Sequence, residues 1–260
     1  MLLKLLKYDF RSMWKQFSFI WPAALILGFI NRFTLPISTS AQSAQLGQAR
    51  EWVALVSMTV FIGVCLAMVV VTAVYVLTRF YRGLLGDEGY LMHTLPVSTW
   101  QLVLSKLVCA LVVTVANGVV GLASIFLMIP LGAQDVLDPE LWNRILRALA
   151  QQPEVLLYML EYCILFLTMF ALMFTMFYLS MAIGHLFARH RVFMSVVAFF
   201  VIDIVGNLIL SFLDRTGLLF HAGVLEGHLS VWIAVGLLAI PTVLMFLGTS
   251  YILKNRLNLE

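Results

Sequence analysis

The sequence predicts an all-α polytopic membrane protein, and three observations carry this prediction. Hydrophobic residues make up 62% of the 260 residues and charged residues only 11%, whereas soluble chains contain about 45–50% apolar and about 25% charged residues. The mean hydropathy is +1.01. The apolar runs are long and do not alternate as the strands of an outer-membrane barrel do. Helices are therefore expected, because they satisfy their backbone hydrogen bonds internally in lipid.

Residues 1–17 are predicted to form an amphipathic helix in the membrane interface. Their apolar residues recur at spacings of three and four and so share one helical face. The other side carries basic residues suited to anionic lipid headgroups, namely Lys4, Lys7, Arg11 and Lys15. The alternative is an extended first span with basic flanks. The apolar run after it is longer than the core of a signal peptide, about 7–15 residues, so we expect it to be retained.

Six transmembrane spans are predicted within one transmembrane domain covering residues 1–260. Their approximate limits are residues 18–37, 53–78, 98–130, 154–184, 192–212 and 229–253. The third span begins at a capping box formed by Ser98 and Gln101. A separate helix is predicted on the outer surface at residues 138–152. Asp138-Pro139-Glu140 is typical of a helix start and Pro153 of a stop, and the helix is too short to span.

The distribution of basic residues predicts the orientation. Loops on the cytoplasmic side of membrane proteins carry the excess of Lys and Arg. Five of the 16 basic residues lie on one side, and the other side holds eleven: Lys4, Lys7, Arg11, Lys15, Arg79, Arg82, Lys106, Arg189, Arg191, Lys254 and Arg256. Both termini and the segment between the second and third spans are therefore expected in the cytoplasm.

Motif searches favour no catalytic function. The chain has no HExxH, no GxSxG and no GxxxxGK[ST] phosphate loop. It is therefore not expected to be an enzyme by itself or to hydrolyse ATP through a phosphate loop of its own. No basic stripe suggests nucleic-acid binding. The three cysteines lie in apolar runs without CxxC spacing, and no metal site is expected.

Four polar residues inside the predicted spans are candidate functional groups: Glu161, Asp203, Asn117 and Asn207. An ionisable group within the membrane is a functional candidate by default, here as a proton relay or cation site, because burying it unpaired is costly. The alternative for each acid is a helix-packing hydrogen bond, or a neutral acid paired with Asn207, Tyr162 or a neighbouring helix. Asn117 is expected to form an interhelical hydrogen bond.

The segment from Arg79 to Lys106 is the mixed polar, glycine-containing and charged stretch between two long apolar blocks. Residues 88–107 read EGYLMHTLPVSTWQLVLSKL. This run closely resembles the EGYL-x-x-TLPVS-x-x-x-L-x-x-SK-L run of bacterial type-2 ABC transporter permeases. The motif covers about twenty residues, and the six-span layout with cytoplasmic termini is also similar to that family.

The resemblance implies a permease subunit that pairs with a second permease, as a homodimer or heterodimer, and with ATP-binding-cassette ATPase subunits. ATP and Mg would be bound by the ATPase, and no cofactor by this chain. It also implies a coupling helix that docks on the ATPase and consists of Gly86, Asp87, Glu88, Gly89, Tyr90, Leu91, Met92, His93, Thr94 and Leu95, followed by Pro96. A second cytoplasmic contact would involve His185, Arg189, His190 and Arg191.

The residue chemistry of this loop is compatible with a coupling helix. Gly86 and Gly89 permit a sharp turn, and Asp87-Glu88 suit a helix N-terminus. The alternative is an ordinary connecting loop packed on its own bundle.

The expected function is export across a bacterial cytoplasmic membrane, driven by ATP hydrolysed on a separate subunit. Two alternatives remain: a secondary ion-coupled transporter using Glu161 and Asp203, and a non-transporting sensor or assembly subunit. The sequence leaves the substrate open.

Overall fold

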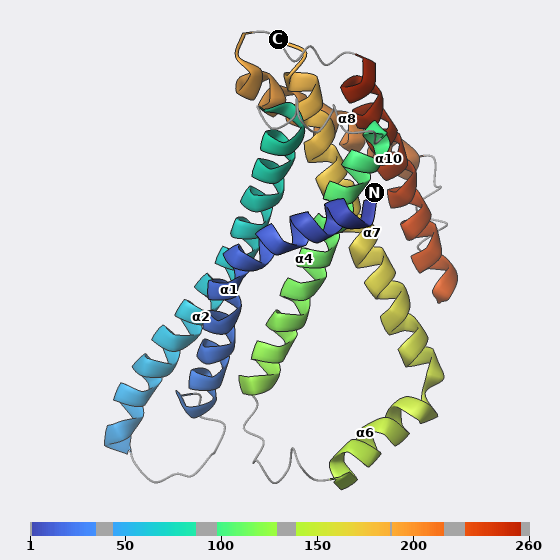
Figure 1. Cartoon of the computed structure of the whole chain (residues 1–260). Helices are drawn as coiled ribbons and strands as arrows, with labels where there is room; N and C mark the ends of the chain where they lie inside the picture. Colours follow the sequence, from blue (N-terminus) through green and yellow to red (C-terminus); the bar gives the residue numbers. More distant parts are fainter. Residues whose placement is uncertain are drawn as a thin grey trace. The chain divides into compact units, whose positions relative to one another are not determined.

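The computed structural model describes residues 2–34, 44–86, 98–128, 139–187, 189–215 and 227–255. Within these ranges the regular secondary structure is entirely helical (Figure 1). Five helical segments are long and apolar enough to cross a membrane: Trp52–Leu85, Thr99–Met128, Pro153–Gly184, Arg191–Arg215 and His228–Asn255. Their length and composition indicate a multi-pass membrane protein.

The first helix differs from the prediction. Residues Leu2–Thr34 form one continuous helix, α1, with Pro22 inside it, so residue 17 is not a helix end. No proline or glycine precedes Trp21, and nothing local therefore stops the helix there. The apolar part that the structure describes in α1, Phe17–Phe33, is shorter than the five spans above. Figure 1 shows the ribbon of α1 changing direction along its length.

The second helix continues beyond the predicted limit of residue 78. Helix α2 covers Ala44–Phe80 and passes directly into a π-helical turn, η1, at Tyr81–Leu85. The Gly86 N–H closes this turn by donating to the Tyr81 carbonyl at 2.8 Å. Gly83, Leu84 and Leu85 are buried. Burial of apolar side chains therefore extends the helical backbone past the basic residues at which the prediction ended it.

The remaining helices lie close to the predicted limits. Helix α4 covers Thr99–Met128, and the carbonyl of Ser98 accepts the N–H groups of Gln101 and Leu102 at its start. Helix α6 covers Pro139–Gln151, α7 Pro153–Gly184, α8 Arg191–Arg215 and α10 His228–Asn255. Gln152 alone separates α6 from α7, which begins with Pro153 at its first position.

The chain divides into two compact units. Unit 1 comprises Met1–Leu6, Val76–Leu111 and Leu149–Glu260, and unit 2 comprises Lys7–Tyr75 and Val112–Ala148. In unit 1, α7 packs against both α8 and α10. In unit 2, the buried Phe17 ring stacks on Trp21 and meets Tyr75 edge-on. Gly28 of α1 lies directly on the backbone of Ser124 in α4, so a side chain at position 28 would collide with it.

Candidate functional site

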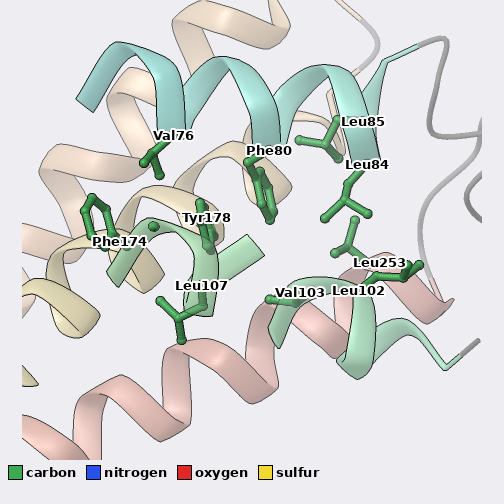
Figure 2. Close-up of a cluster of buried hydrophobic side chains, with 11 residues drawn as sticks. Val76, Phe80, Leu84, Leu85, Leu102, Val103, Leu107, Phe174, Tyr178 and Leu253 are labelled. Atoms are coloured by element: carbon green, nitrogen blue, oxygen red, sulfur yellow. The ribbon is translucent and has the colours of Figure 1, made fainter. Parts of the chain in front are cut away.

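The base of the predicted coupling loop is built into the core of unit 1. The loop base, defined here as Phe80 at the end of α2, η1 with Gly86, and the start of α4 from Ser98 to Leu107, flanks residues 87–97. Leu84 and Leu85 from η1 and Leu102 and Val103 from α4 belong to one buried cluster (Figure 2). That cluster also contains Leu253 of α10. Both ends of the loop are thus held by the same apolar core.

An aromatic stack connects the loop base to α7. The ring of Phe80, fully buried, lies parallel to that of Tyr178, with centroids 4.0 Å apart and planes 7° apart. Figure 2 shows the two rings facing each other between the α2 end and α7. Aromatic pairs of this kind add about 0.5–1.5 kcal/mol beyond area burial. A displacement of the loop base would therefore either break this stack or move α7 as well.

Lys106, from the SK pair of the motif, is buried against the π-helical turn. Its residue is only 4% exposed. A Cβ on Gly83 would lie 3.5 Å from the Lys106 Cε and 3.6 Å from Nζ. Because residue 83 is a glycine, the Lys106 side chain has space to pass beside the turn. Lys106 was predicted on the cytoplasmic side from the distribution of basic residues, but its burial was not predicted.

The elbow, defined here as the described residues 185–187 and 189–190 between α7 and α8, contains His185, Arg189 and His190 of the predicted second contact. The His185 ring lies 5.3 Å from that of Tyr81 in η1. Arg189 and His190 are exposed, His190 has a φ of +63°, and the exposed Arg191 begins α8. Burial, and secondarily the charge of Arg191, lowers the pKa of His185 below its ordinary value. The elbow and the loop base, far apart in sequence, thus touch.

At Gly184 the backbone of α7 closely approaches the backbone of α8. A Cβ on this residue would overlap the Ser195 hydroxyl of α8 and lie 2.6 Å from the Ser195 backbone nitrogen. Such distances leave room only for hydrogen, so glycine is required at the end of α7. The ends of α7 and α8 that the elbow joins are therefore in direct backbone contact.

All predicted coupling residues except Gly86 lie outside the residues that the structure describes. These are Asp87, Glu88, Gly89, Tyr90, Leu91, Met92, His93, Thr94, Leu95 and Pro96. Gly86, which is described, has φ −97° and ψ −165° and so adopts an extended conformation directly after η1.

Glu161 is buried in a hydrogen-bonded cluster between α7 and α10. Its residue is 3% exposed. The indole N–H of Trp232 donates to Oε1 at 3.0 Å, and Nδ1 of His228 lies 2.8 Å from Oε2. The ring of Tyr158, one helical turn before Glu161, stacks on His228 at 4.1 Å. Both carboxylate oxygens therefore have partners, which satisfies a group that would be costly if buried alone.

The partners of Glu161 were missed by the sequence analysis. His228 and Trp232 lie 67 and 71 residues away, and nothing local connects them to Glu161. Of the partners considered for this acid from sequence, the structure shows groups of a neighbouring helix, α10. The spacing of four between His228 and Trp232, which places both on one face of a helix, was the available signal.

Asn117 joins three helices of unit 2. The Trp21 indole N–H of α1 donates to Asn117 Oδ1 at 2.7 Å, and Asn117 Nδ2 donates to the Thr72 hydroxyl of α2 at 2.6 Å. Thr72 in turn donates to the carbonyl of Met68. Asn117 therefore makes interhelical hydrogen bonds, and this network occupies both ends of its amide.

Asp203 and Asn207 occupy a different setting on α8. Both are exposed and line a groove of about 400 Å³ between α7, α8 and α10. Asn207 Nδ2 donates to the backbone carbonyl of Asp203 at 2.9 Å. Within the part of the chain that the structure describes, the Asp203 carboxylate has no hydrogen bond or ion pair. The two acids of the sequence analysis are thus not brought together.

Comparisons with protein-family models, with curated proteins and with solved structures find no match to this chain.

Proposed function

We propose that the chain is the permease subunit of an ATP-binding-cassette exporter in a bacterial cytoplasmic membrane, with both termini in the cytoplasm. A separate ATPase subunit would hydrolyse ATP with its bound Mg, and a second permease subunit would complete the translocation path. The observation that supports the proposal is the motif of residues 88–107, whose described part, from Ser98 to Leu107, shares one buried core with η1 on the other side of the loop.

The core gives this loop the mechanical support that a coupling element needs. A lever transmits a rigid-body motion only if its base does not yield. The loop base is fixed to α7 by the stack of Phe80 on Tyr178 and to α10 by the burial of Leu253 in the same cluster. Movement of residues 87–97 by a docked ATPase would therefore displace several spans of unit 1 together.

The elbow supplies a second point at which the same partner would act. Tyr81 of the loop base contacts His185 of the elbow. The exposed Arg189 and Arg191 lie beside it and provide positive charge for an acidic rim on the ATPase. The two contacts implied by the family resemblance would thus form one continuous docking surface.

The first experiment is purification of the tagged chain from its native membrane, followed by identification of bound proteins. An ATP-binding-cassette ATPase should be recovered, and the chain alone should show no ATP hydrolysis. In the reconstituted complex, Tyr90→Ala and Glu88→Arg should weaken ATPase binding and stimulation. Arg144→Ala, on the exposed face of α6, is the control that should change neither. Normal ATPase binding and stimulation by both loop variants would refute the coupling assignment.

Ion-coupled transport remains a second candidate because Asp203 lies in a groove within a predicted span. It requires transport that follows an ion gradient in proteoliposomes containing only this chain. ATP-independent, proton-driven uptake that Asp203→Asn abolishes would decide for this candidate and against the permease.

A further inference from the structure

The groove beside Asp203 combines an apolar wall with one carboxylate that has no partner among the described residues. Its volume is about 400 Å³, within the range of small-molecule pockets, about 300–1,000 Å³. Asp203 and Asn207 are the two polar side chains of the lining, and the rest is supplied by residues such as Leu172 and Met176 of α7 and Leu244 of α10. A ligand for this groove must therefore be largely apolar.

The depth of Asp203 makes its exposure costly. Twelve residues separate it from Arg191 and twelve from Arg215, the two ends of α8, or about 18 Å in each direction at 1.5 Å per residue. The hydrocarbon core of a bilayer is about 30 Å thick. Asp203 therefore lies near the midplane, where its short side chain cannot reach the headgroups. Ionisable residues at this depth are found paired or facing a polar cavity.

We propose that this groove binds a hydrophobic organic cation, with its single positive charge against the Asp203 carboxylate and its apolar groups against α7 and α10. The carboxylate gains the partner that it lacks among the described residues, and the ligand gains an apolar wall. Because its charge is surrounded by apolar groups, such a cation is only weakly hydrated and is inexpensive to transfer into the membrane.

The lining argues against an inorganic cation. Calcium takes 6–8 oxygen ligands and magnesium requires near-octahedral coordination. The groove offers the carboxylate of Asp203 and the amide oxygen of Asn207. Pro241 of α10 lacks an N–H, so the carbonyl of Leu237, another lining residue, loses its helical donor. One carboxylate with two neutral acceptors suits a single diffuse charge better than a dehydrated metal ion.

Gly206 gives the groove its depth and provides a test residue. It lies between Asp203 and Asn207 on the lining face of α8. A Cβ at position 206 would meet no atom within 4 Å among the described residues. Gly206→Leu should therefore fill the groove without disturbing the helix packing. Gly236 of α10 is equally open but does not line the groove, so Gly236→Leu is the matched control.

The test measures binding of tetraphenylphosphonium to the full chain in lipid nanodiscs by equilibrium dialysis, with empty nanodiscs subtracted. We expect saturable binding of one cation per chain. Asp203→Asn should weaken it about tenfold to a hundredfold, the range for a hydrogen bond or contact to a charged group, whereas Asp203→Glu should retain it. Gly206→Leu should abolish saturable binding and Gly236→Leu should not. Tetraphenylborate, similar in size but negative, should not compete.

Four results would overturn the proposal. They are no saturable binding by the folded wild-type chain, unchanged affinity in Asp203→Asn, equal competition by tetraphenylborate, or a changed oligomeric state of Gly206→Leu in a chain that binds no cation. The last would identify the groove as a contact with a second protein subunit. Because the assay uses neither ATP nor the ATPase, its failure would leave the proposed permease function standing, and the reverse also holds.

Discussion

Replacing Glu161 tests whether this buried acid holds α7 and α10 together. Glu161→Ala removes both oxygens and leaves the Trp232 indole N–H and His228 without their acceptor. Interhelical hydrogen bonds in membrane proteins contribute about 0.6 kcal/mol on average and about 1.7 at most. Two such bonds give a loss of about 1–3 kcal/mol. Glu161→Gln keeps the size and one acceptor oxygen, so about half that loss is expected.

Thermal unfolding of the detergent-solubilised chain measures this loss. One kcal/mol shifts the Tm of a chain of about 150–250 residues by about 2–4 °C, so Glu161→Ala should lower Tm by about 2–12 °C. The control is Glu154→Gln, an exposed carboxyl in the first turn of the same helix. It should cost at most the value of a helix-terminal charge, about 0.3–1 kcal/mol.

A double-mutant cycle separates the hydrogen bond from general damage. Trp232→Phe removes the donor to Oε1. The combined loss in Glu161→Ala with Trp232→Phe should be smaller than the sum of the two single losses, because both substitutions break the same bond. Additive losses, or a Tm of Glu161→Ala equal to that of the Glu154→Gln control, would refute the structural role. A Glu161→Gln protein of unchanged stability that no longer transports would instead support a proton relay.

Three further predictions concern the elbow and the orientation. Gly184→Ala should destabilise the chain by about 1–3 kcal/mol, as overpacking does. Gly236→Ala should leave the Tm unchanged, because only position 184 meets Ser195. Equal Tm values for the two variants would contradict the close approach. The lowered pKa of His185 means that the packed elbow binds fewer protons than an opened one. The stability of the elbow should therefore fall as pH decreases through the ordinary histidine value near 6.5, and His185→Gln should flatten this dependence in a Tm series against pH. An unchanged slope would exclude His185 as its source. In a chain with its cysteines replaced, Lys254→Cys should be labelled only from the cytoplasmic side and Arg144→Cys only from the outside, and the reverse pattern would invert the topology.

Helix positions could be predicted from sequence because hydropathy and the residues that start and stop helices act locally. The helix at residues 138–152 was predicted from Asp138-Pro139-Glu140 and Pro153, and α6 covers Pro139–Gln151. Two limits differ from the prediction, one where no local signal ends the helix and one where packing extends it. Helix α1 runs through residue 17, and helical backbone continues from α2 into η1 because Leu84 and Leu85 enter the core.

Contacts between residues far apart in the chain could not be predicted from the sequence. The stack of Phe80 on Tyr178 and the burial of Lys106 depend on which faces of separate helices meet. Each apolar helix here is hydrophobic around most of its circumference, so the sequence offers no amphipathic stripe from which to choose the packed face. Hydrogen bonds such as those of Asn117 were predictable in kind, but their partners Trp21 and Thr72 were not.

The two membrane acids show how tertiary contacts give similar residues different roles. Glu161 and Asp203 were indistinguishable in the sequence, each a lone carboxyl in an apolar span. The structure buries Glu161 against two partners from α10, the Trp232 indole N–H and the His228 ring, whereas Asp203 is left exposed in a groove at the midpoint of α8. A satisfied carboxylate contributes to packing, while an unsatisfied one at the midplane has free energy to gain from a cation. Of the two, Asp203 is therefore the acid to which the proposed cation would bind.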